Sequence, residues 1–89
     1  MKFVINDCYG GYSFSTDFLL IYGKEIESLE RNGPKLVTAV EEFGLRNASS
    51  TYSRLCIREI PDDATDYSIE EYDGAESIVY VKDGKLHWV

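Results

Sequence analysis

Cysteine is scarce in this sequence of 89 residues, which contains two, Cys8 and Cys56. Two cysteines are too few for a disulfide framework and lack the paired spacing of a zinc site, so we expect free thiols and no metal. Long apolar runs without charge are also missing, which argues against insertion into a membrane. The acidic Asp7 follows the start too closely to leave room for the apolar segment of a signal peptide. We therefore expect a cytoplasmic protein.

Basic residues are few as well, with 9 lysines and arginines against 16 acidic residues and a formal net charge of -7. This sign opposes the counterion release that drives nucleic-acid binding, so we expect no direct contact with DNA or RNA. A basic protein partner is compatible with the same charge. What the sequence does have is 44% hydrophobic and 13% aromatic residues, a composition typical of a folded soluble protein, and a length suited to one domain spanning residues 1–89.

The first half of the chain predicts one strand and two helices. Lys2 to Asn6 is an apolar, β-branched run ended by a turn cluster, which indicates a strand. Ser15 stands at the N-cap position of a helix that Gly23 ends, and a second helix follows Pro34 as far as Gly44. The segment 24–31 fits either a continued helix or an extended piece, and we expect a loop over 45–52.

The second half predicts strands. Arg54 to Ile60 and Tyr67 to Tyr72 are strand candidates, and apolar residues on both sides of Asp83-Gly84 indicate a hairpin. The order strand, helix, helix and then adjacent strands favours an α+β domain with two helices packed on one face of a small, mostly antiparallel β-sheet. The opposite sheet face would then be available to a partner or to a second copy of the chain, giving a homo-oligomer.

Three segments together resemble a family of small uncharacterised phage and prophage proteins that share an IN-x-CYGGF-x-LS opening. They read VINDCYGGYSFS, GPKLVTAVEEFG and LCIREIPDDATDYSIEEYDGAESI, and they cover most of the chain in the same order. The sequence departs from that opening at Tyr12 and Phe14, and its residues after Ile78 diverge. The resemblance implies a phage-type accessory protein, acting in the host cell cytoplasm if a phage encodes it, and it carries no activity to transfer.

The corner between the first strand and the first helix invites two interpretations. Exposed N–H groups beside a helix N-terminus are able to hold an anion, and the glycines would permit close approach of a phosphorylated or nucleotide-like ligand. The residues of this candidate ligand site are Asn6, Cys8, Tyr9, Gly10, Gly11, Tyr12, Ser13 and Ser15. The plainer interpretation, which we favour, is a tight glycine turn followed by a capped helix, because neither a phosphate-loop nor a dinucleotide fingerprint is present.

An enzymatic function is not expected. Cys8 lies close to the expected helix start, where a thiol pKa is lowered, but nucleophilic catalysis also needs a base. His87 is the sole histidine and belongs to the terminal strand, for which a surface or interface role is the simpler interpretation. We therefore predict no catalytic residues and no cofactor.

Carboxylates are dense between residues 59 and 76, and such a run most often forms a solvated face. The stretch lacks the glycine and closing glutamate of a calcium loop, so we predict no metal there. Our leading hypothesis is a non-enzymatic protein that binds a host or phage protein through its sheet face and acidic segment, with partner-binding residues Glu70, Tyr72, Asp73 and Glu76. The alternative is sequestration of a small anionic ligand at the corner described above.

Overall fold

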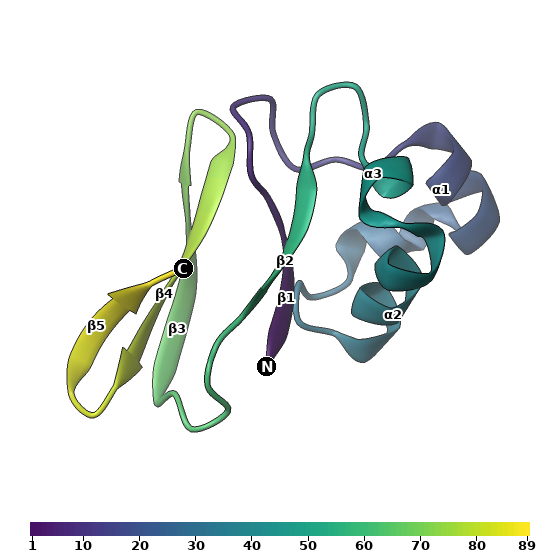
Figure 1. Ribbon diagram of the computed structural model, residues 1–89. Coiled ribbons are helices and arrows are strands. Elements are labelled where there is room, and N and C mark those ends of the chain that lie inside the picture. The colour runs from purple at the N-terminus through teal and green to yellow at the C-terminus, as the bar shows by residue number, and fades with distance from the viewer.

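The computed structural model describes residues 1–89 as three stacked layers (Figure 1). The elements in chain order are β1 (Lys2–Asn6), α1 (Thr16–Tyr22), the 3-10 helix η1 (Lys24–Ser28), α2 (Pro34–Phe43), α3 (Leu45–Ala48), β2 (Leu55–Glu59), β3 (Asp66–Tyr72), β4 (Ala75–Lys82) and β5 (Lys85–Trp88). The helices form one layer, β1 and β2 form the inner sheet, and β3, β4 and β5 form the C-terminal sheet.

The inner sheet carries apolar residues on both faces, and β1 is buried from Phe3 to Asn6. β1 and β2 pair antiparallel from Lys2 opposite Glu59 to Asn6 opposite Leu55. Side chains alternate across a strand, so Val4 packs into the helical core while Phe3 and Ile5 pack against the C-terminal sheet. A strand with two apolar faces requires a layer on each side.

The helical layer is built on an aromatic and aliphatic core. Phe18, Leu36 and Val40 are fully buried and pack with Val4 of the inner sheet. α1 begins after the Ser15 cap, and α2 carries proline at its first turn, where the missing N–H costs nothing. Both predicted helices are therefore present at the expected places.

The C-terminal sheet is a meander with the order β3, β4, β5. Ile78 of β4 is fully buried and packs with Phe3, Ile5 and Ile60, which fixes the sheet against the inner one. The two turns place Asp73 and Asp83 at φ values of 51° and 54°, each followed by a glycine at positive φ. Such Asp-Gly pairs form the tight turns whose twist suits antiparallel strands.

The predicted α+β class is confirmed, two details differ from the expectation, and one undecided segment is resolved. The strands divide between two sheets, so the inner sheet face opposite the helices is covered. Residues 24–28 of the undecided segment form η1. The expected loop 45–52 begins with the single turn α3, because Ala48 fits the core with no exposed surface and the Ser49 hydroxyl satisfies the carbonyl of Leu45 at 2.7 Å. None of the helices is both long and apolar enough to cross a membrane.

Candidate functional site

The side chain of Asn6 at the end of β1 is fully buried and joins three segments of the chain. Its Nδ2 donates hydrogen bonds to the carbonyl oxygens of Cys8 and Gly74, both at 2.7 Å. Its Oδ1 accepts a hydrogen bond from the backbone N–H of Arg54 at 2.8 Å. The opening loop, residues 7–14, is thereby tied to the β3–β4 turn and to the segment before β2. Asn6 has no free donor to offer a ligand at this corner.

Two glycines allow the backbones of these segments to touch. A Cβ atom on Gly10 would lie 1.6 Å from the carbonyl oxygen of Tyr52. A Cβ atom on Gly74 would lie 2.6 Å from the amide nitrogen of Gly11. These close approaches explain glycine at positions 10 and 74 without any ligand, whereas Gly11 has open space beside it and a φ of 111°.

The two predicted hydroxyl donors also have partners within the chain. The Oγ atom of Ser15 accepts from the N–H of Phe18 at 3.2 Å and donates to the carbonyl of Asn47 at 2.7 Å. The hydroxyl of Ser13 pairs with that of Ser50 in the loop before β2. Ser15 is thus the helix cap that the sequence predicted, and the corner is organised as a turn.

The two tyrosines of the corner occupy opposite environments. Tyr9 is 74% exposed, while the ring of Tyr12 is covered by Arg31, whose guanidinium carbon lies 3.4 Å from the ring centroid. The Tyr12 hydroxyl is buried without a hydrogen-bond partner. Burial outweighs the opposing effect of the Arg31 charge and raises the pKa of Tyr12 to about 12. One face of the Tyr12 ring is therefore already taken by Arg31.

Arg31 in turn forms the most buried ion pair of the molecule, which the sequence analysis missed. Its two terminal nitrogens contact the two carboxylate oxygens of Glu76 at 2.7 and 2.8 Å. Glu76 Oε1 also accepts from the N–H of Asn6 at 2.8 Å, and the Glu76 side chain is only 6% exposed. The sequence did contain a signal for the burial of Glu76. Glu76 lies two residues before Ile78 and therefore shares the buried face of β4.

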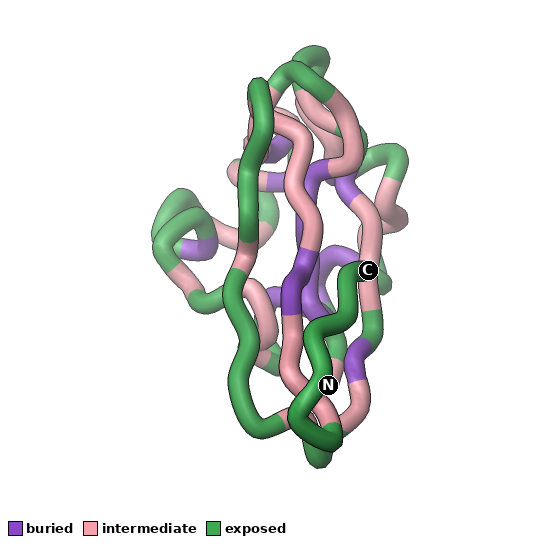
Figure 2. Tube along the Cα trace, turned by 90° about the vertical axis from the view of Figure 1, so that its left-hand side faces the viewer, coloured by how far each residue is buried: buried purple, intermediate pink, exposed green.

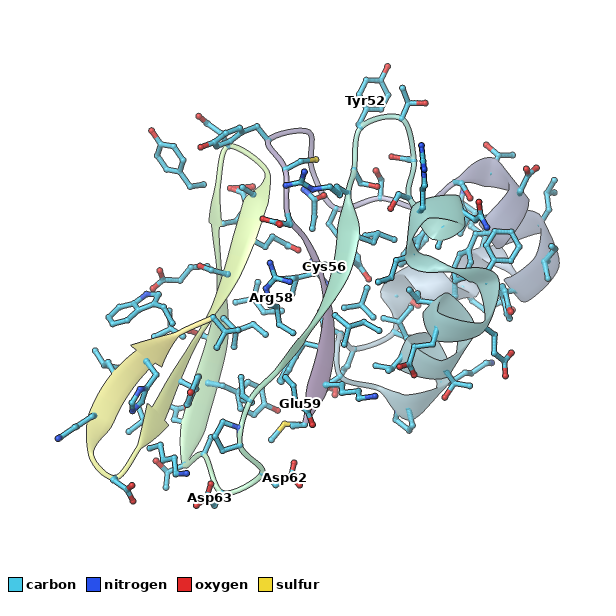
Figure 3. All side chains as sticks on the ribbon, viewed as in Figure 1. Tyr52, Cys56, Arg58, Glu59, Asp62 and Asp63 are labelled. Atoms are coloured by element: carbon cyan, nitrogen blue, oxygen red, sulfur yellow. The ribbon has the colours of Figure 1, made fainter.

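The structure brings no base to the thiol of Cys8. The Sγ atom of Cys8 contacts Asn6 Oδ1 and the carbonyl oxygen of Tyr52, both at 3.3 Å. The ring of His87 stacks on Tyr80 in the C-terminal sheet, with centroids 5.1 Å apart. Cys56 lies between the two sheets (Figure 3), where burial raises the pKa of its thiol.

The outer face of the C-terminal sheet, which points away from the inner sheet, is partly apolar. Ile78 faces inward, so Val79 and Val81 face outward, and their register partners are Trp88 and Leu86. Trp88 and Leu86 are each 59% exposed, whereas Val79 is buried at 8% exposure. Figure 2 views this sheet with β3 as its long, almost fully exposed margin. We call the set Val79, Val81, Leu86 and Trp88 the apolar patch.

The predicted partner-binding residues divide between surface and interior. Asp66 and Glu70 project from β3 on the same face as the apolar patch, and Tyr72 and Asp73 are exposed at the end of that strand. Glu76 differs from the expectation, because its carboxylate is bound to Arg31 inside the molecule. The surface beside the apolar patch is thus acidic without any contribution from Glu76.

The remaining carboxylates of the acidic segment are dispersed. Asp62 and Asp63 lie at the end of the molecule opposite Tyr52 (Figure 3). Asp62 contacts the amino group of Met1 at 2.6 Å, and this hydrogen bond lowers the pKa of the Asp62 carboxyl. No group of three histidine, cysteine, aspartate or glutamate side chains is placed to hold a metal ion.

Comparison of the chain with protein-family models, with curated proteins and with solved structures found no match.

Proposed function

We propose that this protein is a non-enzymatic accessory protein of the phage type that binds a protein partner through the outer face of its C-terminal sheet. The observation that carries the proposal is the apolar patch, where the side chains of Trp88 and Leu86 are each 59% exposed beside Val81 and the buried Val79. Exposed aromatic and aliphatic side chains that adjoin one another are typical of protein-binding surfaces.

The charge beside the patch selects the kind of partner. Asp66 and Glu70 flank the patch on β3, and the whole chain carries a net charge of -7. A partner with an apolar centre and lysine or arginine beside it would complement this surface, and its encounter would be accelerated at low salt. The two free thiols suit the reducing cytoplasm, where we place the interaction.

Ligand sequestration at the opening corner has weaker support. The buried amide of Asn6 and both serine hydroxyls are already hydrogen-bonded within the chain, and Arg31 covers Tyr12. An anion would have to replace these contacts rather than add to them. Calorimetric titration with nucleotides tests this alternative, and measurable heat lost in Tyr12→Ala would revive it.

Site-specific photocrosslinking in the producing cells tests the proposed surface. A photoreactive phenylalanine analogue at Leu86 is expected to capture a partner protein, whereas the same analogue at Leu20 of α1, which is 78% exposed, should not. The captured protein is then purified and titrated against the chain while the emission of Trp88, the single tryptophan, is followed. A blue shift that weakens as salt rises supports the proposal. Equal capture at both positions, capture of a second copy alone, or unchanged emission overturns it.

A further inference from the structure

β3 is an edge strand, and the backbone N–H and C=O groups on its free side form no hydrogen bond with another strand. Ile78 exchanges both hydrogen bonds with Val89 on the β5 side, at 3.0 and 2.9 Å. Because bonding direction alternates along a strand, Val79 bonds toward Ser68 of β3. The N–H and C=O groups of Tyr67, Ile69 and Glu71 therefore point away from β4, at the margin of the sheet.

A local hydrogen bond supports this assignment. The N–H of Tyr67 donates to the carboxylate of its neighbour Asp66 at 2.9 Å, as expected for an N–H group without a strand partner. The backbone groups of Ile69 and Glu71 take part in no loop, turn or side-chain hydrogen bond. The edge of β3 is thus free for pairing over its central residues.

A groove runs beside this free edge. It has a volume of about 460 Å³, and one wall is the segment 29–32 between η1 and α2. Tyr67 and Ile69 face the groove from β3, and Phe3 contributes an edge-to-face contact with Tyr67 at a centroid distance of 5.0 Å. A strand added to β3 would direct every second side chain into this groove, whose apolar residues are Phe3, Leu29, Tyr67 and Ile69.

The charges around the groove favour a basic occupant. Glu30 lies in the wall of the groove, and Asp66 and Glu70 project from β3 on the other sheet face. Arg31 also lines the groove, but its charge is neutralised by Glu76. β3 itself contains no lysine or arginine.

We propose that β3 binds an extended segment of the protein partner as an added strand, with apolar residues in the groove and lysines or arginines on the outer side. This inference rests on the proposed function and names the partner's binding element. Backbone pairing would supply affinity, and the groove together with Asp66 and Glu70 would supply specificity.

A synthetic peptide with the sequence Lys-Val-Lys-Ile-Lys-Val-Lys and blocked ends probes the edge directly. We expect it to shift the amide NMR signals of residues 67–71 and to slow hydrogen exchange at Ile69, while a glutamate-for-lysine version of the peptide does not bind. Shifts confined to β5 or to the helices, or equal binding of the two peptides, would overturn the proposal. So would a doubled mass in native mass spectrometry without peptide that Glu71→Pro abolishes, because the edge would then serve a second copy.

Two pairs of variants separate backbone pairing from charge. Glu71→Pro removes an outward N–H group at an edge position that tolerates proline, and it should weaken peptide binding at least about tenfold. The matched variant Glu71→Gln changes the charge equally and should retain most of the affinity. Glu70→Lys should weaken binding, whereas Glu42→Lys, an equal charge change on α2, should not. Equal losses in Glu71→Pro and Glu71→Gln would reject strand addition.

The peptide experiment is distinguishable from the test of the proposed function. Trp88→Ser alters the apolar patch on the far side of the sheet, so peptide binding should stay within about twofold of wild type. If Leu86 captures a partner but the peptide leaves β3 unperturbed, strand addition fails and the outer-face proposal stands. If the peptide binds β3 and Leu86 captures nothing, the outer-face proposal fails. The claim that the strand added to β3 comes from a partner bound at the outer face then fails as well.

Discussion

At the scale of single residues, Tyr12 combines favourable ring contacts with a buried hydroxyl that has no hydrogen-bond partner. Tyr12 packs edge-to-face on Phe14, with centroids 5.1 Å apart, and lies under the guanidinium of Arg31. A phenylalanine would make the same ring contacts without burying a hydroxyl. The hydroxyl of Tyr12 therefore adds a desolvation cost that no hydrogen bond offsets.

This hydroxyl makes stability depend on pH in the alkaline range. Folding raises the pKa of Tyr12 from 10.0 to about 12, so the folded chain holds the phenolic proton more tightly than the unfolded chain. The stability that is linked to the protonated phenol is fully present below the pKa of the unfolded chain, 10.0. It is lost as pH rises from that value toward the pKa of the folded chain, about 12. We expect the free energy of unfolding of Tyr12→Phe to match or exceed that of wild type near neutral pH. The difference in favour of Tyr12→Phe should grow above pH 10. Urea unfolding across this range measures the difference.

The exposed Tyr9 provides the control for that experiment, because Tyr9→Phe removes a hydroxyl that solvent already surrounds. Its stability should follow the wild-type pH profile throughout. Profiles of Tyr12→Phe and wild type that remained parallel to pH 12 would contradict the burial of the phenol.

At the scale of elements, sequence reasoning located what local chemistry determines. Ser15, Pro34 and the Asp-Gly turns mark their elements because caps, fixed φ angles and positive φ act within a few residues. The division of the strands into two sheets was missed, because it depends on Phe3 and Val4 each having a buried side to fill. The ion pair was missed for a similar reason, since Arg31 and Glu76 are 45 residues apart in the sequence.

The same long-range dependence makes Asn6 the residue that holds the loops together. Asn6→Ala would leave the carbonyls of Cys8 and Gly74 and the N–H of Arg54 without their partner. We expect a loss of about 3 kcal/mol in the free energy of unfolding, together with faster amide exchange at Arg54. Asn47→Ala is the control, because that exposed side chain makes a single bond to the carbonyl of Phe43 and should cost less than about 1 kcal/mol. Equal losses in urea unfolding would contradict this role.

At the scale of the whole molecule, two features couple the C-terminal sheet to the rest. Ile78 packs against Phe3 and Ile5, and the Arg31–Glu76 ion pair crosses from the helical layer to β4. Neither the inner sheet nor the C-terminal sheet can bury its apolar side alone. The layers should therefore unfold together rather than one at a time.

Two probes measure that cooperativity. Trp88 emission reports on the C-terminal sheet and far-ultraviolet circular dichroism reports on the helices, so their urea transitions should coincide. Glu76→Gln leaves Arg31 without its ionic partner and should lower stability by about 3 kcal/mol while both transitions move together. Glu42→Gln on the exposed face of α2 should change little. A circular dichroism signal of the helices that persists at urea concentrations above the Trp88 transition would show that the layers unfold independently.

The opening loop, the segment before β2 and the β3–β4 turn meet at one end of the molecule, and this arrangement has a consequence for engineering. Backbone atoms make the close contacts there, as Gly10 against Tyr52 and Gly74 against Gly11 show, while the side chains of Tyr9, Tyr52 and Tyr72 project into solvent at 74%, 72% and 74% exposure. The frame is held by main chain and by one buried asparagine. Randomising these tyrosines would therefore produce a library of different surfaces on one unchanged skeleton, as the hypervariable loops of an antibody do.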